Sequence, residues 1–446
     1  MISNYLKLAL RVLGRKKFFT SISLFGISFT LGILMVILSF LQSEMGTQKP
    51  MSQKDDYMLM ENLKLQQVFY DTITTIDTIV ENNITLYDTT YDYKSRGRMM
   101  WNSGMNNGIA EEYLRDMNTV EKMTIFNDGS QYDVYVNGIK ITLNCLYADP
   151  SYFEIFDHEI VEGRTLDDND MKTAAQVAVI STKTAENYFG TKNGVVGKEM
   201  LVDGKNFKVI GLYPFRGKIR EFISPHMVVP YTITNEEDQS TFYHGFYSVV
   251  AVKKEGVTHK QVKEEVKQRA LTVPLDHPSK PPGYNEVIIA TKTYDEMIAG
   301  GIYYDEDPEK SYNVMKWVLF SLLAFFILLP TLNLINLNVS RIMERSAEIG
   351  VRKAFGAHQG NILSQFIIEN IVQTIIGGLL GLGLALLIIR AINVGGAMGD
   401  VILQLSPKFF IYSFILTLIF GIISGFLPAY RMSKLQIVNA LKQNRL

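Results

Sequence analysis

The stretch "ERSAEIGVRKAFGAH", residues 344–358, is a short charged segment between long uncharged apolar runs. Read as a helix, it places Glu348 four residues before Arg352, the favourable order for an ion pair along a helix. Gly356 is then expected to end this helix, and Asn361 to cap a second one. A short, charged helix of this kind suits contact with another protein; the alternative is a solvated loop whose basic residues only flank the membrane.

Four uncharged windows surround this segment. Each is long enough to cross a bilayer, because about 20 apolar residues at 1.5 Å rise span a hydrocarbon core of about 30 Å. They run over residues 18–43, 317–340, 370–389 and 409–430. The first window follows Lys16 and Lys17, as a signal peptide would, but it is 26 residues long and no small-residue cleavage site follows it. The sequence therefore predicts four retained transmembrane helices.

The distribution of basic residues orients these helices. Residues 1–17, 341–364 and 431–446 together carry 13 Lys and Arg against two acids, so all three are expected on the cytoplasmic side. Residues 1–17 also have one basic and one apolar helical face, typical either of an interfacial amphipathic helix or of an ordinary basic flank. The resulting map gives spans at 18–43, 317–340, 365–390 and 409–430, an outer domain at 44–316, a cytoplasmic loop at 341–364, an outer loop at 391–408 and a cytoplasmic tail at 431–446.

The outer segment 44–316 is large and acidic, with 29 basic and 41 acidic residues. Its length is sufficient for a sizeable core, and its composition favours an α+β fold. Cys145 is the only cysteine of the chain, which rules out an intramolecular disulfide and suggests a small buried side chain.

Several local patterns predict elements of this domain. Strands in residues 81–150 are expected to turn at Asn127-Asp128-Gly129 and at Asn137-Gly138. The segment "VAVISTKTAENYFG" (177–190) predicts a buried strand followed by a helix, and "MLVDGKNFKVIGLY" (200–213) predicts a hairpin. "THKQVKEEVKQRALT" (258–272) has the charge pattern of an exposed helix, and residues 273–284 are rich in proline, as in a connector.

Two of the predicted membrane segments contain pairs of glycines at a sequence spacing that suits helix packing. Gly377 and Gly381 stand four apart in the third span, and Gly421 and Gly425 in the fourth, a spacing that permits close helix approach. Glu369 lies just before the uncharged part of the third span, where it fits either an ion-transfer role or, as we expect, a boundary carboxylate that reaches the interface.

Motifs of catalysis are missing from the sequence. It contains no G-x-x-x-x-G-K-[ST] phosphate loop, no H-E-x-x-H and no C-x-x-C, and its histidines lack metal-ligand spacing. The acidic run Asp167, Asp168 and Asp170 is more typical of a solvated turn than of a site. We therefore predict a non-catalytic protein with no bound cofactor, no metal and no nucleic-acid partner.

Longer stretches resemble one family. "ERSAEIGVRKAFGAHQGNILSQFIIENIVQTIIGGLLGLGLALLI" (344–388) is similar to the signature segment of the FtsX/MacB-like permeases of ABC transporters. The closing "LPAYRMSKLQIVNALK" (427–442) resembles the family's last segment, from which Ser433 and Ile437 depart. Residues 152–164 and 177–213 resemble the MacB-type periplasmic core domain.

This resemblance implies a function. It predicts a permease dimer, homomeric or heteromeric, whose ATPase subunit is a separate chain that binds ATP and Mg²⁺. The loop between spans two and three would contact that ATPase and couple its cycle to movement of the outer domain. The residues that the resemblance places in this role are Glu344, Arg345, Glu348, Gly350, Arg352, Lys353 and Gly356.

The work done outside the membrane stays open at this point. It could be export of a peptide, drug or toxin through a periplasmic adaptor and an outer-membrane duct, or extraction of lipoproteins. An FtsX-like regulator that activates a cell-wall hydrolase is the alternative, and an adhesin or receptor would not need the charged loop. Both the transporter and the regulator hypotheses predict that the chain lies in the bacterial inner membrane, in contact with lipid, with both termini in the cytoplasm.

Overall fold

A computed structural model describes most of the chain as two compact units. One unit comprises residues 47–312, and the other comprises residues 1–46 together with 313–446. The described residues are 17–81, 84–218, 220–234, 242–278, 280–344, 351, 355, 358–398, 401–405, 407–408, 410–415, 418–419, 422, 426 and 430. The predicted helix at 1–17 and the predicted tail at 431–446 therefore lie almost wholly outside the described part.

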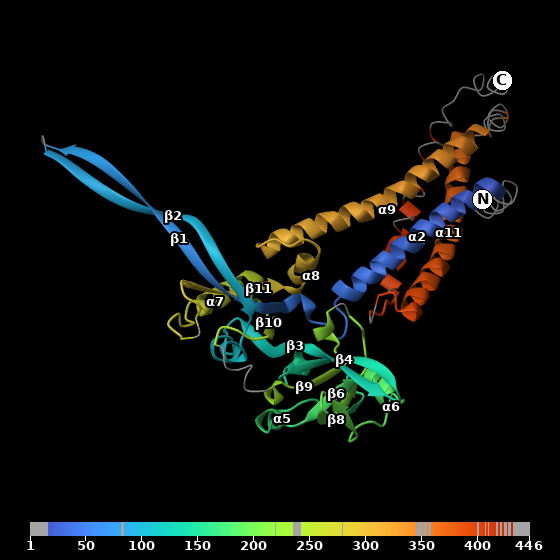
Figure 1. The fold of residues 1–446 in the computed structure, drawn as a ribbon. Coiled ribbons are helices and arrows are strands. Elements are labelled where there is room, and N and C mark those ends of the chain that lie inside the picture. Colours follow the sequence, from blue (N-terminus) through green and yellow to red (C-terminus); the bar gives the residue numbers. More distant parts are fainter. Residues whose placement is uncertain are drawn as a thin grey trace. The chain divides into compact units, whose positions relative to one another are not determined.

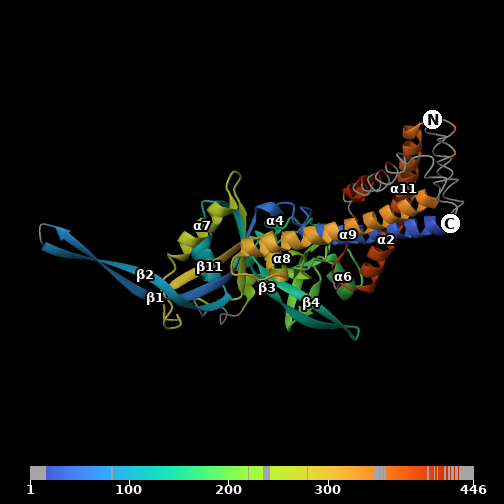
Figure 2. The same ribbon diagram turned by 90° about the horizontal axis from the view of Figure 1, so that it is seen from above.

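The unit at 47–312 is built on one mixed sheet of 11 strands (Figures 1 and 2). Its strand order is β11-β1-β10-β3-β4-β9-β6-β8-β5, with β2 paired to β1 and β7 paired to β8. Most neighbouring pairs are antiparallel, whereas β4 with β9 and β6 with β8 are parallel. The strands are β1 (Tyr57–Glu81), β2 (Ile84–Gly104), β3 (Val120–Val136), β4 (Ile139–Ala148), β5 (Glu162–Gly163), β6 (Val177–Ser181), β7 (Glu199–Val202), β8 (Lys205–Tyr213), β9 (Met227–Pro230), β10 (Tyr247–Lys253) and β11 (Glu286–Thr293).

Short helices cover this sheet and connect its strands. Five of the ten begin at a residue whose side chain accepts a backbone N–H; among them, Ser181 caps α6, Thr258 caps α7 and Thr293 caps α8. The helical elements are η1 (Lys54–Asp56), α3 (Asn107–Ile109), η2 (Ala110–Leu114), α4 (Tyr152–Ile155), α5 (Asp168–Lys172), α6 (Thr182–Phe189), η3 (Glu221–Ile223), η4 (Tyr231–Ile233), α7 (His259–Ala270) and α8 (Tyr294–Ile302).

Three hydrophobic clusters hold the unit together. One packs Val262 and Val266 of α7 against strands that include Val249 of β10 and Ile289 of β11. A second is aromatic and groups Tyr57, Phe126, Tyr152, Phe156 and Tyr213 with other residues, and the third lies around β6, β7 and β8. Cys145 is buried in the third cluster, as a lone thiol was expected to be.

Local predictions for this unit are mostly confirmed. The hairpin β7–β8 turns at Asp203-Gly204, β6 runs into α6, and α7 matches the predicted exposed helix. The turn at Asn137-Gly138 joins β3 to β4, with φ of 51° and 79°. The turn expected at Asn127-Asp128-Gly129 is wrong: these residues lie inside β3, where the register with β4 shifts by one between Asn127 and Ser130, so β3 contains a bulge of one extra residue.

Strands β1 and β2 form a long two-stranded ribbon. They pair with each other from Asn62↔Gly104 to Glu81↔Ile84, with one register shift at Phe69/Tyr70. Their neighbours reach only the base: β10 pairs with β1 up to Met60, and β11 up to Gln66. Figures 1 and 2 show the ribbon extending well away from the rest of the sheet.

The second unit consists of long helices. They are α2 (Lys17–Met45), most of α9 (Pro308–Glu344) and α11 (Gln359–Gly395). Two helices among the described residues are long and apolar enough to cross a membrane, Thr20–Met45 and Leu363–Gly395. The predicted span at 317–340 lies within α9, and the one at 409–430 lies partly outside the described residues.

The ends of α11 differ from the prediction. His358, not Asn361, is its N-cap, because the His358 ring nitrogen accepts the Gly360 N–H at 3.3 Å and Asn361 already lies inside the helix. The helix also continues five residues beyond the predicted end at 390 and stops at Gly396, whose φ of 60° suits the left-handed C-cap.

Candidate functional site

The predicted coupling residues fall at the end of α9 and just after it. Glu344 is the last residue of α9. Arg345, Glu348, Gly350, Arg352, Lys353 and Gly356 lie outside the described residues. Their roles, and the helix break expected at Gly356, therefore stay predictions.

The predicted packing glycines of the third span face α2. A Cβ at Gly377 would lie 2.6 Å from Ile27 Cγ2, and one at Gly381 would lie 2.9 Å from the Ser28 carbonyl oxygen. From the α2 side, Gly32 approaches α11 closely as well: a Cβ at Gly32 would lie 3.0 Å from Leu384 Cδ2. Only glycine at these positions allows the two backbones to approach so closely. Gly421 and Gly425 lie outside the described residues.

A polar stripe on α11 was not anticipated as a group. Gln365, Glu369 and Gln373 follow one another at four-residue spacing and are all buried, at 8%, 5% and 1% exposure. Glu369 is therefore enclosed by protein, whereas the sequence suggested a carboxylate reaching the membrane surface. The signal that could have shown this is the i, i+4 spacing, which places all three on one helix face.

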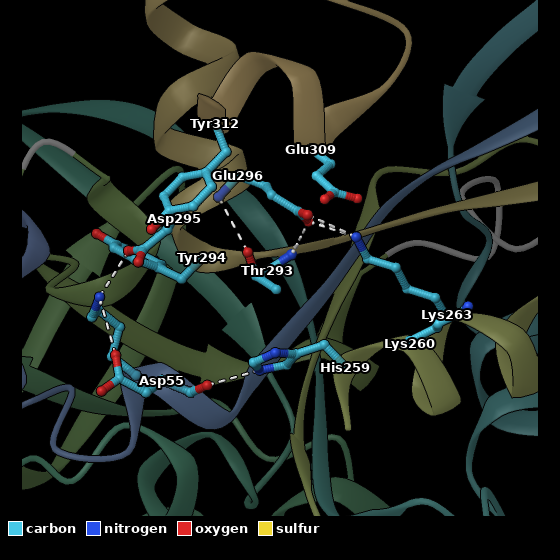
Figure 3. A pocket seen from close by; sticks show the side chains of 11 residues that line it. Asp55, His259, Lys260, Lys263, Thr293, Tyr294, Asp295, Glu296, Glu309 and Tyr312 are labelled. Atoms are coloured by element: carbon cyan, nitrogen blue, oxygen red, sulfur yellow. Dashed lines mark hydrogen bonds and ion pairs between the residues drawn. The ribbon is translucent and has the colours of Figure 1, made fainter. Parts of the chain in front are cut away.

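A pocket of about 690 Å³, called the polar pocket below for its charged and polar lining residues, lies inside the unit at 47–312, the predicted outer unit (Figure 3). Four elements meet there: η1 and the N-terminal parts of α7, α8 and α9. Its lining residues are charged or polar, with two tyrosines among them. The lining residues are Lys54, Asp55, His259, Lys260, Lys263, Thr293, Tyr294, Asp295, Glu296, Glu309 and Tyr312.

Ion pairs tie these elements together. Lys54 is only 5% exposed; its Nζ lies 2.7 Å from Asp295 Oδ1 and 5.8 Å from the centre of the Tyr294 ring. On the other side, Lys263 of α7 donates to both carboxylate oxygens of Glu296 at 2.8 and 2.9 Å. His259 Nε2 donates to the Asp55 carbonyl oxygen at 2.8 Å. The arrangement therefore joins η1 and α7 to α8.

Glu296 has a second function in this pocket. Besides pairing with Lys263, its carboxylate accepts the Thr293 N–H at 2.8 Å, while the Thr293 hydroxyl accepts the Glu296 N–H at 3.2 Å. This capping box fixes the first turn of α8, which leads within a few residues to α9. The sequence signal was available, since Thr-x-x-Glu precedes an apolar segment, but it was not used.

In the part of the chain that the structure describes, no cluster of three His, Cys, Asp or Glu has the geometry of a metal site. The acidic run at 167–170 is a helix start: Asp167 caps α5, and Asp170 pairs with Arg164 at 2.5 and 2.9 Å.

The fold and these sites define a class: a membrane protein with long apolar helices and a large α+β domain inserted between them. The chain belongs to the family of the MacB-like periplasmic core domain, whose model matches residues 20–269. Residues 320–437 match the FtsX-like permease C-terminal model. The protein is therefore an ABC transporter permease of the MacB/FtsX type.

Two named relatives agree with this assignment. The chain is 28% identical over 329 residues to a Bacillus subtilis protein named uncharacterized ABC transporter permease YknZ, covering 73% of this chain and 74% of that protein. It is 26% identical over 311 residues to the macrolide export ATP-binding/permease protein MacB of Neisseria meningitidis, covering 68% of this chain but only 44% of MacB. The chain thus spans less than half the length of that fused relative.

Among solved structures, the periplasmic region of MacB from Actinobacillus actinomycetemcomitans aligns with 46% of this chain and 86% of that one. The TM-score is 0.33 and the sequence identity 18%.

Proposed function

We propose that this chain is a non-catalytic permease subunit that couples ATP hydrolysis by a separate ATPase subunit to movement of its outer domain. The observation that carries the proposal is the continuity of α9, which extends from Pro308 to Glu344. At 1.5 Å per residue, this helix is about 55 Å long. It connects the first predicted coupling residue, Glu344, to the polar pocket that Glu309 and Tyr312 line.

The pocket supplies the next step of the proposed path. Movement of the first turn of α9 acts on α8, which is covalently close and whose own first turn is fixed by Thr293 and Glu296. Asp295 and Glu296 then carry the displacement to η1 and α7 through their ion pairs with Lys54 and Lys263. Since η1 directly precedes β1, the path reaches the root of the long ribbon.

The assembly proposed around this chain follows the family. Four spans with both termini in the cytoplasm place the 47–312 unit outside the inner membrane, and a second permease protomer completes the membrane part. ATP and Mg²⁺ bind to the ATPase subunit. The outer movement serves export of a peptide, drug or toxin with an adaptor and an outer-membrane duct, or the extraction of lipoproteins.

A charge exchange in the coupling loop tests the proposal. The tagged protein is purified from its native membrane in mild detergent, and bound proteins are identified by mass spectrometry. A phosphate-loop ATPase is expected with the native chain and is expected to be lost in the Glu348→Arg/Arg352→Glu variant. The matched control exchanges the exposed pair Asp133 and Lys140 of the outer unit, 2.7 Å apart, and should retain the ATPase.

Two results would contradict this. Retention of the ATPase by the loop variant would remove these residues from the contact, and failure to recover any ATPase with a folded native chain would contradict the coupling itself. Recovery of a cell-wall hydrolase with the complex would favour the regulatory function over export.

A further inference from the structure

Most of the charged side chains that line the polar pocket are paired with one another. The pairs are Lys54 with Asp295, Lys54 with Asp55, and Lys263 with Glu296. Two charged lining residues remain, Lys260 of α7 and Glu309 of α9, and neither has an ion pair among the described residues. After internal pairing, the lining therefore offers one ammonium group and one carboxylate to a bound molecule.

These two side chains belong to different elements on different sides of the pocket. Figure 3 shows Glu309 on the α9 side and Lys260 on the α7 side. Both side chains are exposed, so each can adjust its position to meet a bound molecule. Their charged atoms are too far apart for an ion pair with each other. A molecule that contacts both must therefore carry its own two charges at separate ends.

The α7 side of the pocket suits a carboxylate. Lys260 lies in the first turn of this 12-residue helix, where the aligned backbone dipoles favour negative charge. Lys263, three residues further along the same helix face, already donates to both carboxylate oxygens of Glu296. In the described part of the chain, Lys260 is therefore the pocket lysine without an acidic partner, and a carboxylate beside it would accept a charge-assisted hydrogen bond.

The α9 side suits an ammonium group. Glu309 and Tyr312 are three residues apart on the same helix face, and both line the pocket. An ammonium group at the Glu309 carboxylate lies near the Tyr312 ring, where cation–π attraction adds to the ion pair. The pocket already contains one arrangement of this kind, since the Lys54 ammonium lies 2.7 Å from Asp295 Oδ1 and 5.8 Å from the centre of the Tyr294 ring.

We propose that the polar pocket binds a small zwitterion, a molecule with an ammonium group at one end and a carboxylate at the other. Glu309 binds its ammonium group and Lys260 its carboxylate. Such a molecule satisfies both side chains and adds no net charge to the pocket, whereas a simple cation or anion satisfies only one of them. The volume of about 690 Å³ lies within the range of about 300–1,000 Å³ of small-molecule sites. This site goes beyond the coupling proposed above, in which a bound zwitterion holds the first turn of α9 against α7.

Trialanine is a suitable probe, because its free termini carry these two charges and its methyl side chains add little else. A ligand-detected NMR titration of the full chain in detergent, without the ATPase, should give a dissociation constant of about 1 mM or below, as expected for two charge-assisted contacts. N-acetyl-trialanine lacks the ammonium group, and trialanine amide lacks the carboxylate. Each blocked peptide should bind the unsubstituted chain about tenfold more weakly than trialanine.

Two variants assign each terminus of the peptide to its side chain. Glu309→Gln should weaken trialanine binding about tenfold and remove the difference between trialanine and its N-acetylated form. Lys260→Gln should instead remove the difference between trialanine and its amide. The matched controls are Glu264→Gln and Lys267→Gln, which neutralise exposed residues of α7 outside the pocket lining and should bind trialanine like the unsubstituted chain.

Four results would each overturn the inference. They are failure of trialanine to bind the folded unsubstituted chain, equal affinity for trialanine and both blocked peptides, a preference for the free amino terminus that persists in Glu309→Gln, and an equal loss of binding in the control variants. The last result would indicate general attraction to the surface of α7. Because binding is measured without the ATPase, a negative result overturns the zwitterion site alone, and the proposed coupling keeps its separate test with the loop variant.

Discussion

Asp149 is a buried carboxylate whose partners come from separate elements. The Thr124 hydroxyl donates to Oδ1 at 2.6 Å, and Arg115 Nη2 lies 3.1 Å from Oδ2. Burial raises the pKa of the Asp149 carboxyl, and the contacts with Thr124 and Arg115 oppose that rise. Arg115 also pairs with Glu111, so one guanidinium connects η2 to the end of β4.

Removing this guanidinium should destabilise the outer unit. Arg115→Ala leaves the buried Asp149 without its cation, and because Arg115 is itself about one-third exposed we expect a loss of about 2–3 kcal/mol in the free energy of unfolding. Thermal unfolding of the full chain in detergent measures the change. Lys140→Ala, which breaks the exposed pair with Asp133, is the matched control and should leave the melting temperature unchanged. Equal effects of the two substitutions would contradict the prediction.

His158 is enclosed by aromatic rings and should make stability depend on pH. Burial lowers the pKa of its imidazole from 6.5 to about 4, against the opposing effect of the hydrogen bond between Nε2 and the Ile223 carbonyl oxygen. Between these two values the unfolded chain binds more protons than the folded one, so stability falls as pH decreases. A shift of this size corresponds to about 3 kcal/mol, lost from pH 6.5 down to about 4.

The non-titrating variant isolates this contribution. His158→Gln keeps a hydrogen-bond donor but no group that titrates in this range. Carboxylates also affect stability at low pH, so the quantity to compare is the difference in unfolding free energy between the two proteins at pH 7 and pH 4.5. That difference should shrink at the lower pH, and parallel pH profiles would rule out His158 as the source.

At the scale of elements, turns and helix caps could be predicted from the sequence where neighbouring residues alone determine them. Asn137-Gly138 adopts the positive φ values that its residue types favour, whereas Asn127-Asp128-Gly129 remains inside β3 because β3 pairs with β4 both at Asn127 and again from Ser130. In the ribbon, β2 lies within the stretch 81–150 where strands were predicted, whereas β1 was not predicted, for a different reason. Its Thr, Tyr and Asp residues do not alternate between apolar and polar, and strands of 25 and 21 residues far exceed the usual five or six.

The candidate sites could be predicted from the sequence only in part, also for physical reasons. Gly377 and Gly381 stood out because small residues at four-residue spacing have one main structural use. The pocket could not be foreseen, because Lys54, Lys263 and Glu296 are ordinary charged residues until the sheet brings η1, α7 and α8 together. Sequence spacing carries no information on contacts between elements more than 200 residues apart.

Packing of α2 against α11 makes a prediction for Gly381. A Cβ there would lie 2.9 Å from the Ser28 carbonyl oxygen and 3.0 Å from Leu31 Cβ, so Gly381→Ala must push the helices apart. We expect a cost of about 1–3 kcal/mol, as for overpacked cores. Gly383 is the control: it lies on the same helix with no neighbour within 4 Å, so Gly383→Ala should be tolerated. Thermal inactivation of the purified protein separates the two, and equal melting temperatures would contradict this close approach.

At the scale of the whole molecule, the proposed topology is open to direct labelling. Single cysteines at Ala397, after α11, and at Ser433, in the tail, should lie on opposite sides of the membrane if the chain crosses it four times. A maleimide that reaches the periplasm but cannot cross the inner membrane should label Ala397→Cys in intact cells and Ser433→Cys only after lysis. The buried Cys145 keeps the background low. The reverse pattern would invert every span.

Continuity of α9 is the central mechanical requirement of the proposed coupling. The helix already contains Pro330, which lacks the N–H needed for one intrahelical hydrogen bond, so the predicted span within α9 can bend while the helix stays continuous. Inserting Gly-Gly-Gly-Ser between Asn313 and Val314 would instead separate the first turn, with Glu309 and Tyr312, from the rest of the helix. A flexible insert of this kind transmits neither force nor rotation, because glycine and serine linkers behave as random coils.

The insertion should therefore uncouple the two units without dismantling the complex. With the ATPase bound, the protease-cleavage pattern of the outer unit should change on addition of Mg²⁺ and ATP in the native chain, and should not change in the α9 insertion variant. The same four residues placed between Pro281 and Pro282, in the proline-rich connector, serve as the control and should leave the nucleotide response intact. If the α9 insertion variant still responds to nucleotide, the outer unit receives the signal by a route other than α9, and the polar pocket at its first turn loses its proposed function.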